Sequence, residues 1–186
     1  MRNYKISEYG RSMIEILGVL SIVGVLSVAG ISGYYKGMTK YKTNQLLDQI
    51  STIANNIKII MSGENTQYGL SIEALFKLKI LPESMIKTCA YPYSSCIKHA
   101  FNSTASVYTG GISVGSTPVF CINVNNIPQE ACAAIAMTDW DTYFGNGQFT
   151  IEVVGGRTTH YFGHYNGLTA AQDCGVNNNI RLCLKF

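Results

Sequence analysis

The chain has 186 residues, of which 47% are hydrophobic and only 13% are charged, about half the charged share that is usual in soluble domains. A formal net charge of +3 is too small for a nucleic-acid-binding surface, and 12 Tyr, 7 Phe and one Trp exclude a wholly disordered chain. The six cysteines are an even number and indicate an oxidising compartment, so the composition predicts an exported protein with a membrane-active segment.

The N-terminal part of the chain contains one long apolar segment. Residues 16–35 carry no charge, and as a helix they span about 30 Å, the thickness of the hydrocarbon core of a bilayer. Glu15 lies at the start of this run, and a short polar segment precedes it. Three interpretations are open: a signal peptide cut after Ala29, a plain single-span anchor, and a leader cut after Gly10.

The residues around the last of these cuts resemble a known processing site. Gly10-Arg11-Ser12-Met13-Ile14-Glu15, followed at once by ILGVLSIVGVL, is similar to the cleavage site of type IV prepilins. The resemblance implies that a prepilin peptidase cuts between Gly10 and Arg11 and methylates the new amine of Arg11. It also implies that Glu15 becomes the fifth residue of the mature chain and takes part in assembly.

The physical chemistry of Glu15 gives a separate reason to expect a partner. An ionised carboxylate within a membrane helix costs about 2.5–3.5 kcal/mol or more unless it is paired. A cut after Gly10 would place a free α-amine four residues upstream, within one helical turn, on the same or a neighbouring subunit. The alternative is that Glu15 only extends to the membrane interface beside Arg11.

The orientation of the apolar segment follows from the cysteines. Basic residues do not decide it, because three lie near each end: Arg2, Lys5 and Arg11 before the run, and Lys36, Lys40 and Lys42 after it. All six cysteines follow the run, so the C-terminal side is expected to be the oxidising one. The N-terminus is therefore expected in the cytoplasm and the rest of the chain outside the inner membrane.

The helical pattern continues beyond the apolar run. Apolar residues recur at intervals of three and four: Leu46, Ile50, Ile53, Ile57 and Ile60. One helix over residues 12–61 would be about 75 Å long, too long for a globular core, so its first half is expected to project and to pack against copies of itself. Four glycines in that half weaken the helix or allow neighbouring helices to approach closely: Gly18, Gly24, Gly30 and Gly33.

Beyond Gly63 the composition changes, and short elements are expected. Helices are predicted over residues 71–78 and 128–137, and strands over residues 106–108, 111–114, 119–124, 148–154 and 180–186. The predicted fold class is α+β, with a long N-terminal helix packed on a small antiparallel β-sheet. The predicted organisation is a leader at 1–10, a transmembrane and assembly half-helix at 11–35, an amphipathic half-helix at 36–62 and a disulfide-stapled globular head at 63–186.

The C-terminal part extends the family resemblance. VFCINVNNIPQEACAAIAMTDW is similar to a strand-turn-helix segment of class b pilins of the thin-pilus, conjugation-associated type. The resemblance implies a structural subunit, not an enzyme, which the pilus machinery of the inner membrane assembles from copies of itself into an extracellular filament. Such a filament could serve adhesion, aggregation, motility or conjugation. The alternatives are a pseudopilin of a type II secretion system and a secreted disulfide-rich binding domain released after Ala29.

Six cysteines allow fifteen pairings, and their spacing alone does not choose among them. The family resemblance favours a bridge between Cys132 and Cys174. Cys89 and Cys96 would then close a small local loop, which leaves Cys121 with Cys183.

No motif predicts catalysis, a metal or a cofactor. Cys96 with His99 and His160 with His164 are the only suggestive metal spacings, and no P-loop motif is present. The sequence matches GxSxG at residues 111–115 and SxxK at residues 84–87 and 95–98, but such short patterns carry no weight without their structural context. Four isolated carboxylates are interpreted as a cap, turn residues and a strand charge, with a cation or ligand site as the alternative: Glu130, Asp139, Asp141 and Glu152. The N-glycosylation sequon at Asn102 is interpreted as a chance match.

Two predicted loops are rich in aromatic residues. The loops cover residues 91–110 and 138–147, and their aromatic residues are Tyr93, Tyr108, Trp140, Tyr143 and Phe144. They are expected either to form an exposed surface for neighbouring subunits or a receptor, or to pack the head.

Overall fold

The computed structural model describes residues 13–63, 72–86, 97–109, 119–144, 149–154, 161–162 and 166–185. Several predictions lie outside these residues: the Gly10–Arg11 cleavage site, the strand over 111–114, the cysteines Cys89 and Cys96, and the histidines His160 and His164. The chain divides into two compact units, an N-terminal unit of residues 1–38 and a C-terminal unit of residues 39–186.

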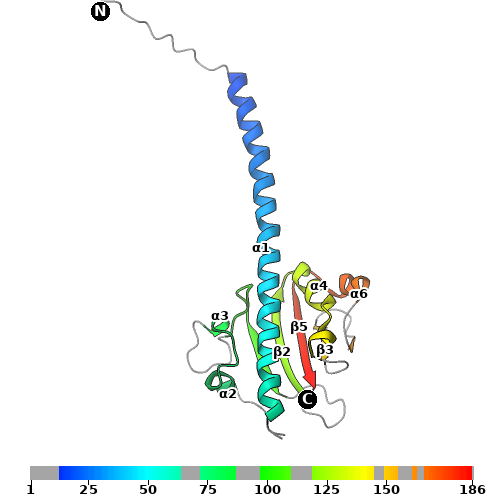
Figure 1. The fold of residues 1–186 in the computed structure, drawn as a ribbon. Coiled ribbons are helices and arrows are strands. Elements are labelled where there is room, and N and C mark those ends of the chain that lie inside the picture. The colour runs from blue at the N-terminus through cyan, green and yellow to red at the C-terminus, as the bar shows by residue number, and fades with distance from the viewer. Residues whose placement is uncertain are drawn as a thin grey trace, which may run out of the picture. The chain divides into compact units, whose positions relative to one another are not determined.

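Figure 1 shows the order of the elements along the chain. The helices are α1 (Met13–Gly63), α2 (Ile72–Lys77), α3 (Glu83–Ile86), α4 (Gln129–Met137), α5 (Trp140–Phe144) and α6 (Gly167–Asp173). The strands are β1 (Ala105–Thr109), β2 (Val119–Ile127), β3 (Phe149–Val154), β4 (Tyr161–Phe162) and β5 (Asn178–Lys185).

The N-terminal unit contributes the first part of α1, and its described side chains are almost all exposed. An 18-residue window of this helix has a mean hydropathy of 2.3 and none of it is buried, so by length and composition the helix could cross a membrane. Two serine hydroxyls are satisfied inside the helix: Ser21 Oγ donates to the carbonyl of Gly18 at 2.8 Å, and Ser27 Oγ donates to that of Val23 at 2.7 Å. These hydroxyls therefore bring no unsatisfied donor to an apolar environment.

The C-terminal unit is built on a five-stranded sheet in the order β1-β2-β5-β3-β4, with every neighbouring pair antiparallel. Side chains alternate between its two faces. Ile122 of β2, Leu182 of β5 and Ile151 of β3 lie side by side in register on one face, and all three are fully buried.

The second part of α1 packs on this buried face. Five of its side chains are buried at helical spacing: Leu46, Ile50, Ile53, Ala54 and Ile57. Helices α2 and α3 add Leu75 and Met85 to the same core, while α4 adds Ile135. The arrangement confirms the predicted α+β class with a long helix on a small antiparallel sheet.

Of the two expectations for the aromatic residues at 138–147, packing of the head is confirmed for two of the three and surface exposure for the third. Residues 140–144 form α5, and Trp140 and Phe144 are each only 1% exposed. Trp140 stacks on Phe149 of β3 with ring centroids 5.2 Å apart, and its indole N–H donates to the carbonyl of Ile135 at 3.0 Å. Tyr143 alone remains on the surface, at 60% exposure.

Candidate functional site

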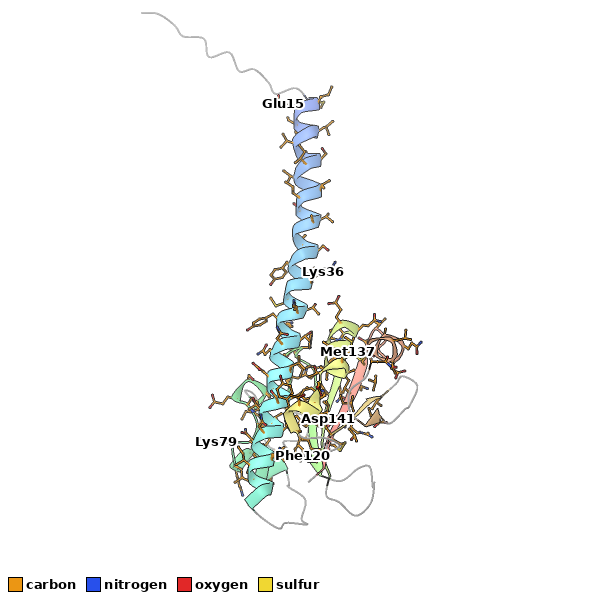
Figure 2. All side chains as sticks on the ribbon, turned by 45° about the vertical axis from the view of Figure 1, so that its right-hand side comes forward. Glu15, Lys36, Lys79, Phe120, Met137 and Asp141 are labelled. Carbon is orange, nitrogen blue, oxygen red and sulfur yellow. A yellow bond between two sulfur atoms is a disulfide. The ribbon has the colours of Figure 1, made fainter. Side chains whose placement is uncertain are left out.

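Glu15 lies in the first turn of α1, where the free backbone N–H groups of a helix favour a negative charge. The next charged residue along the helix is Lys36, twenty-one residues later, which corresponds to about 30 Å of rise. Figure 2 shows these two side chains at opposite ends of the apolar span. The helix therefore presents a bilayer-length apolar surface with one carboxylate at its start.

Small residues recur at every third position of this span. They are Gly18, Ser21, Gly24, Ser27, Gly30 and Gly33. A row of i, i+3 positions winds around an α-helix, because each step of three residues falls about 60° short of a full turn. A Cβ added at any of the four glycines would meet no atom within 4 Å. The row therefore forms a groove that faces different directions at successive heights and admits close helix approach.

Tyrosines mark the C-terminal end of the apolar span. Tyr34 and Tyr35 are exposed and lie edge to face, with ring centroids 6.3 Å apart, next to Lys36. Tyrosine and lysine are the residues that anchor membrane helices at the boundary between hydrocarbon and water. This pattern places the end of the hydrophobic surface close to the junction of the two units.

Two disulfide bonds cross-link the C-terminal unit. Cys132 of α4 is bonded to Cys174, which directly follows α6, with a Cα–Cα distance of 5.9 Å. Cys121 of β2 is bonded to Cys183 of β5, its direct partner in the sheet, with a Cα–Cα distance of 4.1 Å. Both bonds are buried: one ties α4 to the residue that follows α6, and the other ties β2 to β5.

The predicted carboxylates are not brought together. Glu152 pairs with Arg181, whereas Asp139 accepts hydrogen bonds from the backbone N–H and the hydroxyl of Thr142 at the start of α5. Glu130 lies exposed in the first turn of α4. Among the described residues, no three His, Cys, Asp or Glu side chains gather in a way that could hold a metal ion.

His99 occupies a fixed, buried position. It is 3% exposed, and its Nδ1 accepts the backbone N–H of Phe101 at 3.2 Å. The ring proton must then lie on Nε2, which donates to the carbonyl of Asn125 at 2.8 Å. Burial lowers the pKa of His99 below its usual value of 6.5, although the hydrogen bond to Asn125 acts in the opposite direction.

Sequence reasoning missed the polar residues that surround His99. Gln49 of α1 is only 4% exposed, and its side chain joins Ser84 of α3 to the backbone of Ala100. The sequence position of Gln49 could have predicted its burial. It lies three residues after Leu46 and next to Ile50, on the helix face that the apolar spacing assigns to the core. Such a buried amide indicates a polar contact with another element.

Comparison with known proteins gives one family. Residues 40–184 match the family model described as PilS N terminal. Among solved structures, the crystal structure of type IV b pilin from Salmonella typhi is similar, with a TM-score of 0.54 and 16% sequence identity over 77% of this chain and 98% of that chain. No curated protein matches the chain. The family match lies within the C-terminal unit and so does not depend on the apolar segment.

Proposed function

Because the chain belongs to the PilS family of type IV pilins, we propose that it is cut between Gly10 and Arg11 and polymerises through α1 into a type IV pilus. The family consists of structural subunits rather than enzymes, and the chain has the pilin fold. The observation that carries the proposal is the contrast within α1. Its second part fills the core of the C-terminal unit, whereas its apolar first part has no partner among the described residues.

Before assembly, the apolar part of α1 lies in the inner membrane. Its uncharged residues match the bilayer in length, and the tyrosines and Lys36 suit one interface. The disulfides support a periplasmic position for the C-terminal unit, because such bonds persist in oxidising compartments. The N-terminus then faces the cytoplasm, where prepilin peptidase removes residues 1–10 and methylates Arg11.

In the filament, the apolar parts of neighbouring helices bury one another. Glu15 pairs with the α-amine of Arg11 on a neighbouring subunit, because a carboxylate in an apolar environment is costly without an opposite charge. The groove of glycines and serines lets successive neighbours approach at different heights. The pilus machinery of the inner membrane performs the transfer from bilayer to filament, and the cross-linked C-terminal unit forms the outer surface that serves adhesion, aggregation, motility or conjugation.

The experiment compares Glu15→Val with Glu130→Val, which removes an exposed carboxylate of α4 and leaves α1 unchanged. In cells that assemble the filament, we expect Glu15→Val to enter the membrane with intact disulfides and to form no filaments, while Glu130→Val assembles normally. The intact mass of the wild-type subunit should correspond to a chain that begins at methylated Arg11. Normal filaments from Glu15→Val would refute the pairing, and a chain that begins at Gly30 would refute the pilus assignment.

A further inference from the structure

A cavity of about 270 Å³ lies on the C-terminal unit between α1, α3 and residues 97–102. This volume is below the roughly 300–1,000 Å³ of pockets that hold drug-sized ligands, so it admits a ligand of about one sugar ring. We propose that this cavity binds a single carboxylated sugar unit, a uronic acid. This binding is separate from filament assembly and does not rest on it.

The walls of the cavity are already fixed by hydrogen bonds. The Gln49 side chain donates from Nε2 to Ser84 Oγ at 3.0 Å and accepts the backbone N–H of Ala100 at 3.1 Å. The backbone N–H of Lys98 donates to the carbonyl of Met85 at 2.9 Å. These contacts join α1, α3 and residues 97–102 before any ligand binds. Ordering of the site on binding therefore costs little free energy.

Both ring nitrogens of His99 are already used, by Phe101 and Asn125, so His99 forms a neutral wall. The groups that remain available are mostly donors. Ser84 Oγ already accepts a hydrogen bond from Gln49, which leaves the hydroxyl proton for a ligand. Gln45, Lys98 and Asn102 also line the cavity, and their side chains make no hydrogen bond or ion pair with the described residues.

This set of groups selects the chemical class of ligand. Two amides and a hydroxyl suit the alternating donors and acceptors of a polyol, and the Lys98 ammonium suits a carboxylate. No acidic side chain lines the cavity to repel an anion. Only Met85 and Ala100 contribute apolar side chains, so the cavity offers little contact surface to an apolar ligand.

The proposal is tested on the full chain in detergent micelles, where no filament is needed. Glucuronate, glucose and acetate are titrated, and backbone amide chemical shifts report the site and the affinity. We expect saturable shifts with glucuronate, confined to residues around 45, 49, 84 and 98–102. Glucose should bind about tenfold more weakly, because it lacks the charge-assisted contact to Lys98, and acetate should bind more weakly than either.

Two variants separate the cavity from general charge effects. Lys98→Gln should lower the affinity for glucuronate about tenfold and leave the affinity for glucose unchanged. Lys77→Gln removes an exposed lysine of α2 outside the cavity and should change neither. Absence of saturable glucuronate binding, equal binding of glucuronate and acetate, or the same loss in both variants would overturn the proposal. None of these outcomes bears on filament assembly, which the Glu15→Val experiment tests.

Discussion

Arg181 of β5 lies directly opposite Glu152 of β3, and its Nη1 atom is 2.9 Å from Oε2 of the glutamate. The same arginine approaches Asn123 of β2 on its other side, with Nε 3.4 Å from Oδ1. The three side chains form a polar row across three strands on the sheet face that points away from α1. The row is asymmetric, because the side chain of Glu152 is 10% exposed and that of Arg181 is 30% exposed.

This asymmetry predicts unequal costs for removing either partner. Arg181→Met leaves a buried carboxylate without its cation and should lower the free energy of unfolding by about 3 kcal/mol. Glu152→Gln leaves an arginine that can reach water and should cost about 1 kcal/mol. Urea unfolding of both single variants and of the double variant measures these losses in the free energy of unfolding. Glu130→Gln, which changes an exposed carboxylate, is the control. A larger loss for Glu152→Gln would contradict the burial order.

The bond between Cys132 and Cys174 should contribute a large part of the stability of the C-terminal unit. It closes a sequence separation of 42 residues, for which chain entropy predicts about 4 kcal/mol. The double variant Cys132→Ala/Cys174→Ala should therefore unfold at a much lower urea concentration. The matched pair is Cys121→Ala/Cys183→Ala, with a separation of 62, whose loss should be only a few tenths of a kcal/mol larger. An unchanged urea midpoint would show that the bridge contributes no stability.

His99 should make the C-terminal unit less stable in mild acid. Burial lowers the pKa of His99 in the folded protein. Below pH 6.5 the His99 imidazole therefore binds a proton in the unfolded chain more readily than in the folded chain. The stabilisation is complete above pH 6.5 and is lost as the pH falls below it, by up to about 1.4 kcal/mol per pH unit for one proton. Two described lysines lie in this part of the unit: Lys98, which lines the same cavity as His99, and Lys42, whose ammonium lies 5.9 Å from the Phe101 ring centroid.

The measurement is the free energy of unfolding between pH 7.5 and 5 for the wild type and for His99→Gln, whose amide can still donate to Asn125. The difference between the two profiles removes the contribution of the other histidines. We expect the variant to be less stable at neutral pH but less sensitive to acid. Parallel profiles would mean that His99 takes up its proton equally well in both states.

The groove on the first part of α1 can be tested at a single position. If neighbouring helices approach at Gly24, then Gly24→Leu should block or strongly reduce filament formation while membrane insertion remains normal. Val25→Leu, at the next residue, changes an exposed side chain that is already large and should assemble. Filament yield by electron microscopy and membrane fractionation measure the two steps separately. Wild-type yield from Gly24→Leu would show that no neighbour packs closely there.

Much of the fold could be predicted from the sequence because its signals are local. The apolar run and the three- and four-residue spacing of Leu46, Ile50 and Ile53 predict one long helix over residues 12–61, and α1 covers Met13–Gly63. The bounds of strands β1, β3 and β5 were predicted within two residues, and β2 was predicted to end three residues too early. Alternation and helical periodicity need no knowledge of distant residues.

The small elements could not be found in this way. Helices α3, α5 and α6 and the two-residue strand β4 are too short for periodicity to reveal, although α2, of similar length, was predicted over residues 71–78. Trp140 and Phe144 are apolar residues between polar ones, a pattern that fits an exposed loop and a short buried helix equally well. Their burial depends on Phe149 of β3, which stacks on both rings.

By itself, the sequence determined the bilayer-length apolar helix, its single carboxylate at Glu15, the separation of this helix from a cysteine-bearing α+β part, and the resemblance to pilins. These properties depend on residue order alone. Only the tertiary structure decided that Gln49 and His99 line one cavity and that Arg181 lies between Asn123 and Glu152. Strand register and helix docking place these side chains together, and both are set by burial of the whole core rather than by any short stretch of chain.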